Sequence, residues 1–124
     1  FDPGCLRTMH GLVGTPLVAL IGGAGGPADP ATQPQALGVI AGYATAIGVD
    51  RARLRRPPGA EGDDERLDPG LVVAAHAAGL AVHVYTFGDP APDQAVLARY
   101  RAYRAAGVDG VFTNDPDHAR LAWQ

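Results

Sequence analysis

The chain has 124 residues, of which 47% are hydrophobic and 19% charged, which suits one folded domain with an apolar core. The net charge is a mild -3, and the sequence contains no basic run typical of nucleic-acid or membrane-surface binding. No apolar run reaches the ~18 residues of a membrane-spanning helix. The single cysteine, Cys5, excludes an internal disulfide. Because the first residue is Phe1 and not methionine, the sequence is expected to begin inside a longer protein.

Helix-like and strand-like segments alternate along the chain. Asp2 and Pro3 predict the start of a short helix, and a continuous apolar run predicts a buried strand at residues 16–21. After a loop rich in glycine and proline, further strands are predicted at residues 46–49, 81–87 and 110–114. The intervening helices are predicted at residues 35–44, 70–78, 94–106 and 115–123, and two of them are expected to end at Gly79 and Gly107. This alternation predicts a parallel α/β sheet, either open or part of a barrel.

Two stretches favour the barrel. Residues 74–87 read AAHAAGLAVHVYTF and residues 105–117 read AAGVDGVFTNDPD. At this spacing they resemble the last two βα units of the glycerophosphodiester phosphodiesterase family, which reads A-H-x-x-G-[LM]-x-V-x-x-[WY]-T and then G-V-D-G-[IVLF]-[IF]-T-[DN]-x-P-D. Residues 1–2, 17–21 and 43–50 resemble the preceding units more loosely. The resemblance implies that residues 1–124 are one partial domain, the C-terminal half (strands five to eight) of a TIM-type (β/α)₈ barrel.

The resemblance also implies an activity for the full-length parent. Members of the family are hydrolases of lipid and glycerol metabolism that cleave glycerophosphodiesters to glycerol 3-phosphate and an alcohol, with a divalent cation, calcium or magnesium. The family's catalytic histidines and metal ligands belong to the first strands, so they are expected upstream of Phe1. The fragment alone is therefore expected to bind no metal and to be inactive. The motif around Tyr85 is most similar to the periplasmic or secreted branch.

Substrate-binding residues are expected at the carboxyl ends of the strands, where barrels bind their ligands. Strand alternation predicts two faces for residues 81–87: one with Ala81, His83, Tyr85 and Phe87, the other with Val82, Val84 and Thr86. The β-branched face is expected to pack on helices, so Tyr85 is expected to point into the barrel and line the pocket, with a plug in the core as the alternative. Phe112 and Asn114 complete the predicted substrate-binding set, although Asn114 could instead anchor the following turn. His83 is expected to be a hydrogen-bonded core residue.

Three loop features have simpler interpretations than a binding site. The glycines of residues 22–26 lack the Lys-Ser/Thr of a phosphate-binding loop and predict a flexible connection. Residues 63–65 are acidic but lack the ligand spacing of a calcium site. A basic cluster follows the strand at residues 46–49 and could attract a phosphate, although pairing with residues 63–65 is the simpler expectation; it comprises Arg51, Arg53, Arg55 and Arg56.

A half-barrel has two unpaired edges. The strands at residues 17–21 and 111–113 are each expected to lack a neighbour on one side, because a barrel closes by pairing its last strand with its first. Open apolar edges recruit other chains. The expected partners are therefore a small glycerophosphodiester and either the missing N-terminal half-barrel or a second copy, with no nucleic acid and no membrane span. The alternative function is a non-catalytic half-barrel that binds a partner or associates with itself.

Overall fold

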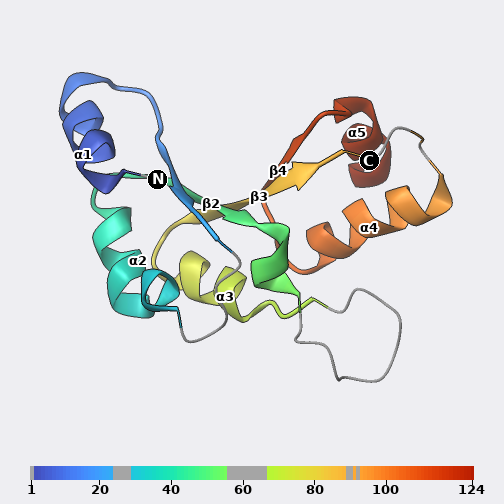
Figure 1. Ribbon diagram of the computed structural model, residues 1–124, viewed down its shortest axis with the longest axis horizontal. Helices are drawn as coiled ribbons and strands as arrows, with labels where there is room; N and C mark the ends of the chain where they lie inside the picture. The colour runs from blue at the N-terminus through green and yellow to red at the C-terminus, as the bar shows by residue number, and fades with distance from the viewer. Residues whose placement is uncertain (1, 24–28, 56–66, 89–90, 92) are drawn as a thin grey trace.

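The computed structural model describes residues 2–23, 29–55, 67–88, 91 and 93–124 (Figure 1). One sheet has the order β1-β2-β3-β4, and its three neighbouring pairs are all parallel. The strands are β1 (Val18–Ile21), β2 (Ala46–Asp50), β3 (Ala81–Phe87) and β4 (Gly110–Thr113). The α-helices are α1 (Pro3–Leu12), α2 (Pro34–Ala41), α3 (Gly70–Ala77), α4 (Gln94–Ala105) and α5 (Pro116–Trp123), and two 3₁₀ helices are η1 (Pro30–Thr32) and η2 (Arg51–Leu54). The predicted α/β class with parallel strands is confirmed.

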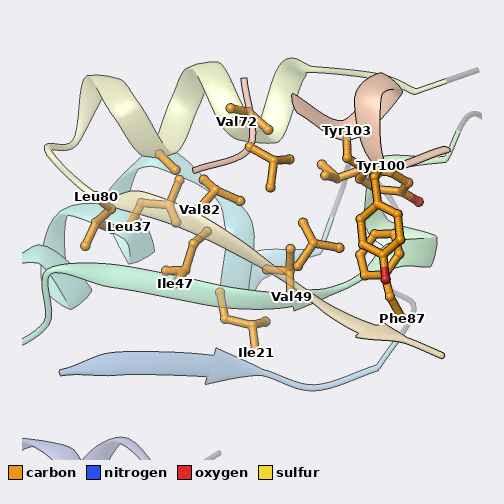
Figure 2. Packing of buried hydrophobic residues seen from close by; sticks show 14 of the residues in the cluster. Ile21, Leu37, Ile47, Val49, Val72, Leu80, Val82, Phe87, Tyr100 and Tyr103 are labelled. Carbon is orange, nitrogen blue, oxygen red and sulfur yellow. The ribbon is translucent and has the colours of Figure 1, made fainter. Parts of the chain in front are cut away.

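The main hydrophobic core lies between the sheet and helices α2 to α5. Alternate residues of the two central strands are fully buried, namely Ile47, Val49, Val82 and Val84 (Figure 2). The helices contribute Leu37, Val72, Ala75, Val96, Tyr100, Tyr103 and Ala122 to the same cluster. Burying each large apolar side chain contributes about 1.5–3 kcal/mol. This packing directs the intervening strand residues to the opposite face of the sheet.

Helix α1 lies at the end of the molecule farthest from α4 and α5 (Figure 1). None of its residues is buried, and Leu6 is the hydrophobic side chain of α1 that packs against a small second cluster, which comprises Leu17, Ala19, Tyr43 and Ala44. The guanidinium of Arg7 lies 5.6 Å from the centre of the Tyr43 ring. Among the described residues, α1 is therefore held to the strands by few contacts.

Glycine ends two helices where the sequence predicted it. Gly79 follows α3 with φ +81°, and Gly107 follows α4 with φ +92°. Both lie in the left-handed region, which costs little only for glycine. The turn after α3 is completed by the Leu80 amide, which donates to the Ala75 carbonyl over 2.9 Å. These turns return the chain to the amino ends of β3 and β4.

Strand β3 contains an irregularity near its carboxyl end. Val84 pairs with Val111 on β4, but the next pair is Phe87 with Thr113. Three steps along β3 therefore correspond to two steps along β4, as in a β-bulge. Such an extra residue changes which face the following side chains occupy.

The bulge overturns one sequence prediction. Phe87 is fully buried on the helix side, stacked on Tyr100 at 4.8 Å between ring centroids and edge-on to Tyr103 at 5.1 Å. Thr86 is exposed instead. The prediction that Phe87 shares a face with Tyr85, and Thr86 the opposite one, is therefore wrong, because strict alternation stops at the bulge.

Candidate functional site

The face of the sheet away from the main core carries the candidate site. This face, called the pocket face below, is formed by Leu20, Gly48, His83, Tyr85 and Phe112. Gly48 lies at its centre, where the side chains of both edge strands meet over β2. A Cβ at Gly48 would overlap Leu20 Cδ2 and lie 3.6 Å from Phe112 Cε2. The absence of a side chain at Gly48 thus lets β1 and β4 contribute to one surface.

Aromatic rings from β3 and β4 form one wall of this surface. Phe112 contacts His83 at 6.0 Å between ring centroids and Tyr85 at 6.4 Å, both edge to face. Phe112 remains 43% exposed, although a residue with a ring of this size usually contributes to a core. An exposed aromatic beside two other rings is suited to contact a ligand.

A cavity of about 380 Å³ opens on this wall and is lined by Leu20, Tyr85, Thr86 and Phe112. It lies toward the carboxyl ends of the strands, which is the ligand-binding end in α/β barrels. The structure therefore brings Tyr85 and Phe112 together as the sequence predicted. Leu20 belongs to an all-apolar run that does not reveal its face, and Thr86 was expected on the helix side, so neither was identified from sequence.

Tyr85 lies at the cavity with its hydroxyl hydrogen-bonded within the chain. Its hydroxyl donates to the Ile21 carbonyl over 2.8 Å, while the residue also lines the cavity. Burial raises the pKa of the Tyr85 phenol above 10.0, and the nearby Asp50 carboxylate raises it further, against the opposing charge of Arg53. The phenol is therefore protonated at neutral pH and remains a hydrogen-bond donor.

Asn114 lies at the same end of the sheet but does not line this cavity. Its backbone amide donates to the Phe87 carbonyl over 3.0 Å, and its side-chain Nδ2 would lie 3.0 Å from a Cβ at Gly88. The following turn is anchored by Thr113, whose Oγ1 accepts from the Asp115 amide over 3.0 Å. The exposed Asn114 amide group is thus placed beside the loop after β3.

His83 lies on the pocket face and not in the core. It is partly exposed and packs beside Phe112 and over Gly110, where an added Cβ would lie 2.8 Å from His83 Cδ2. Within the described ranges no hydrogen bond is observed for its ring. The expectation of a hydrogen-bonded core histidine is therefore not met.

Two arginines of the basic cluster are engaged in contacts within the chain. Arg53 forms an ion pair with Asp29 at 2.8 Å, and Arg51 lies 5.1 Å from the centre of the Phe87 ring. The pKa of Asp29 is lowered, first by the hydrogen bond from the Ala31 amide and then by Arg53. The cluster was expected to pair with residues 63–65, which lie outside the described residues, as does Arg56. Arg53 therefore has a different partner, Asp29, whose side chain is partly exposed.

Two further kinds of feature are absent from the described residues. Residues 2–23, 29–55, 67–88, 91 and 93–124 contain no group of three or more His, Cys, Asp or Glu side chains that could hold a metal ion. This part of the chain therefore does not fit a metal site. In the same residues no helix is both long and apolar enough to cross a membrane.

A parallel sheet flanked by helices, with a cavity at the carboxyl ends of its strands, is typical of α/β proteins that bind small ligands. Comparison of the sequence with protein-family models identifies the family. The model of the glycerophosphoryl diester phosphodiesterase family matches residues 18–118. The chain therefore belongs to this family. No curated protein gives a significant match to the sequence.

Solved structures support the fold. Eleven chains match, and one is a crystal structure from Silicibacter pomeroyi DSS-3 of a protein assigned as a glycerophosphoryl diester phosphodiesterase. It is 20% identical and superposes with a TM-score of 0.56 over 96% of this chain and 33% of that one. The chain thus spans about a third of the length of that protein. At this identity the likeness establishes the fold alone, a four-stranded part of a larger α/β barrel protein.

Proposed function

We propose that residues 1–124 form the C-terminal part, strands five to eight, of the barrel of a glycerophosphodiester phosphodiesterase. The full-length protein hydrolyses glycerophosphodiesters to glycerol 3-phosphate and an alcohol. The observation that carries this proposal is the family match over residues 18–118, whose two most specific motifs contribute Tyr85 and Phe112 to one cavity. The motif around Tyr85 favours the periplasmic or secreted branch.

The chemistry is divided between two parts of the barrel in this proposal. The divalent cation, calcium or magnesium, and the groups that transfer protons belong to the segment before Phe1. The described residues of this chain supply the wall that binds the organic part of the substrate. The isolated chain is therefore inactive and binds no metal.

Tyr85, Phe112 and Asn114 are assigned to substrate binding. The two rings and Leu20 offer carbon surface to the glycerol or alcohol moiety, in a cavity of about 380 Å³. Pockets of 300–1,000 Å³ are typical for small ligands. Thr86 and Asn114 add polar side chains at the same end of the sheet, where they can accept or donate hydrogen bonds to substrate hydroxyls.

The edges of the sheet are assigned to the rest of the barrel. β1 and β4 each pair with one neighbour only in the described sheet. The first half of the barrel pairs with these two edges in the full-length protein and faces the exposed Phe112 across the pocket. Without it, a second copy of the chain is the competing partner, because unpaired strand edges associate.

Alanine variants of the full-length protein test the substrate-binding assignment, with glycerophosphocholine as substrate. Phe112→Ala is expected to raise KM about tenfold, since apolar contact worth roughly 1.4 kcal/mol is lost. Leu121→Ala is the matched control, because Leu121 on α5 is also exposed, at 54%, but does not line the cavity. Equal kinetics for both variants would remove Phe112 from the substrate site.

A further inference from the structure

The chain after β1 is held by side chains that come from two other elements. The Tyr85 hydroxyl on β3 donates to the Ile21 carbonyl over 2.8 Å. Arg53 on η2 donates through Nη2 to the Gly22 carbonyl and through Nε to the Gly23 carbonyl, the latter over 2.9 Å. Three successive backbone carbonyls are therefore each bound by Tyr85 or Arg53.

Arg53 also binds the far side of the same connection. Its Nη1 lies 2.8 Å from Asp29 Oδ2, and the Arg53 side chain is only 3% exposed. Asp29 in turn accepts a hydrogen bond from the Ala31 amide, over 2.9 Å, at the start of η1. The hydrogen bonds and the ion pair found for Arg53 among the described residues all go to Gly22, Gly23 and Asp29. A buried guanidinium is well suited to fix these residues relative to one another, because its planar fork holds several acceptors at once.

We infer that Arg53 is a positioning residue for the substrate pocket: by fixing the carbonyls of Gly22 and Gly23 it fixes the adjacent Ile21 carbonyl, and so the place of the Tyr85 ring. Arg53 itself is absent from the residues that line the cavity on the pocket face. It lines the adjacent hollow with Ile21 and Gly22, so its effect on the cavity of the pocket face is exerted through Tyr85. The consequence for substrate binding rests on the proposed function, whereas the effect on Tyr85 does not.

The direction in which the Tyr85 pKa changes when Arg53 is replaced tests this inference, because charge and positioning predict opposite changes. Burial and Asp50 raise the phenol pKa, and the positive charge of Arg53 lowers it. If Arg53 acted only as a charge, its loss would raise the pKa of Tyr85 further. If Arg53 positions the ring, its loss releases the hydroxyl from the Ile21 carbonyl into water, and the pKa falls toward the ordinary value of 10.0.

The experiment is an ultraviolet titration of tyrosinate in the full-length protein. Each variant is compared with its Tyr85→Phe counterpart, so that the difference between the two titrations contains the absorbance change of Tyr85 alone. Arg53→Gln removes the charge, whereas Arg53→Lys keeps a charge beside Asp29 but loses the fork. Arg101→Gln on the exposed side of α4 is the control.

Both Arg53 variants are expected to lower the Tyr85 pKa toward 10.0, while Arg101→Gln leaves it unchanged. An increase in Arg53→Gln with no change in Arg53→Lys would overturn the inference, because it would show a purely electrostatic effect. If Arg53→Gln does not fold, the charge-retaining Arg53→Lys decides alone, since only positioning predicts a shift in it.

A kinetic cycle with glycerophosphocholine gives the second readout. Arg53→Lys is expected to raise KM about fivefold, the equivalent of one hydrogen bond, and to have no further effect in a Tyr85→Phe background. Additive effects would show that Arg53 does not act through Tyr85 and would overturn the inference. If the wild-type protein hydrolyses no glycerophosphodiester, the proposed function fails, and the titration still decides the role of Arg53.

Discussion

The imidazole Nε2 of His76 lies 2.8 Å from Asp109 Oδ2, and the same carboxylate oxygen accepts the backbone amide of Val82 over 2.7 Å. This contact connects α3, the start of β3 and the residue before β4. It therefore joins the two stretches that most resemble the family, residues 74–87 and 105–117. It lies at the amino ends of the strands, opposite the cavity, where barrel residues serve stability.

Asp109 is expected to matter more for stability than His76. Asp109→Ala leaves the Val82 amide without its acceptor and should lower the free energy of unfolding by about 1–2 kcal/mol. His76→Ala should cost no more than about 0.5 kcal/mol, because both side chains are over 40% exposed and exposed ion pairs contribute little. Urea unfolding of the full-length variants measures both losses. Equal losses would show that the ion pair, and not the amide bond, dominates.

The same carboxylate gives stability an acid dependence. Burial by itself raises the pKa of Asp109, but the Val82 amide and His76 outweigh it, so the folded pKa lies below 3.8. The folded state therefore prefers the charged form, and its stabilising contribution is complete above 3.8 and lost as pH falls through the folded value. Thermal unfolding between neutral and acidic pH should show this loss in the wild type and a smaller one in Asp109→Asn. Parallel acid profiles for the two proteins would contradict it.

Two glycine substitutions are expected to change stability in opposite directions. Gly107→Ala should destabilise by about 1–2 kcal/mol, because φ is +92° and the new Cβ would lie 3.1 Å from Val72 Cγ1. Gly38→Ala within α2 should stabilise by about 0.5–1 kcal/mol, since no atom lies within 4 Å of the added Cβ and alanine favours helix. Melting temperatures of both variants test the pair. The same direction of change in both would refute the assigned backbone geometry.

Alanine substitutions at Phe87 in the core and at Phe112 on the pocket face are expected to differ in their effect on stability. Phe87→Ala should cost about 3–5 kcal/mol, because it empties a fully buried position between Tyr100 and Tyr103. Phe112→Ala should cost under about 1.5 kcal/mol, since Phe112 is 43% exposed. Denaturant unfolding compares the two. A larger loss for Phe112 would mean that the pocket face is a core in the full-length protein.

Much of the fold follows from local patterns in the sequence. The apolar runs predict the positions of all four strands. Gly79 and Gly107 follow the ends of their helices because the turn there needs a positive φ, which glycine adopts easily. The meeting of Tyr85 and Phe112 follows from parallel pairing of neighbouring strands, which aligns their carboxyl ends.

Long-range contacts account for what the sequence did not show. The bulge in β3 depends on its pairing with β4, so the reversed faces of Thr86 and Phe87 have no local signal. The ion pair between Arg53 and Asp29 joins residues far apart in the sequence, and nothing local distinguishes Arg53 from the other arginines of the basic cluster. The position of Leu20 on the pocket face depends on its packing against Gly48 of the neighbouring strand, which the local sequence does not indicate.

We propose that this chain supplies the substrate wall of a phosphodiesterase whose catalytic groups lie elsewhere in the full-length protein. The most direct measurement is the release of glycerol 3-phosphate from glycerophosphocholine, with calcium or magnesium and after chelation, by the full-length protein and by the 124-residue chain. The account predicts cation-dependent release by the full-length protein and none by the chain alone. Release by the isolated chain, or none by the full-length protein with either cation, would contradict it.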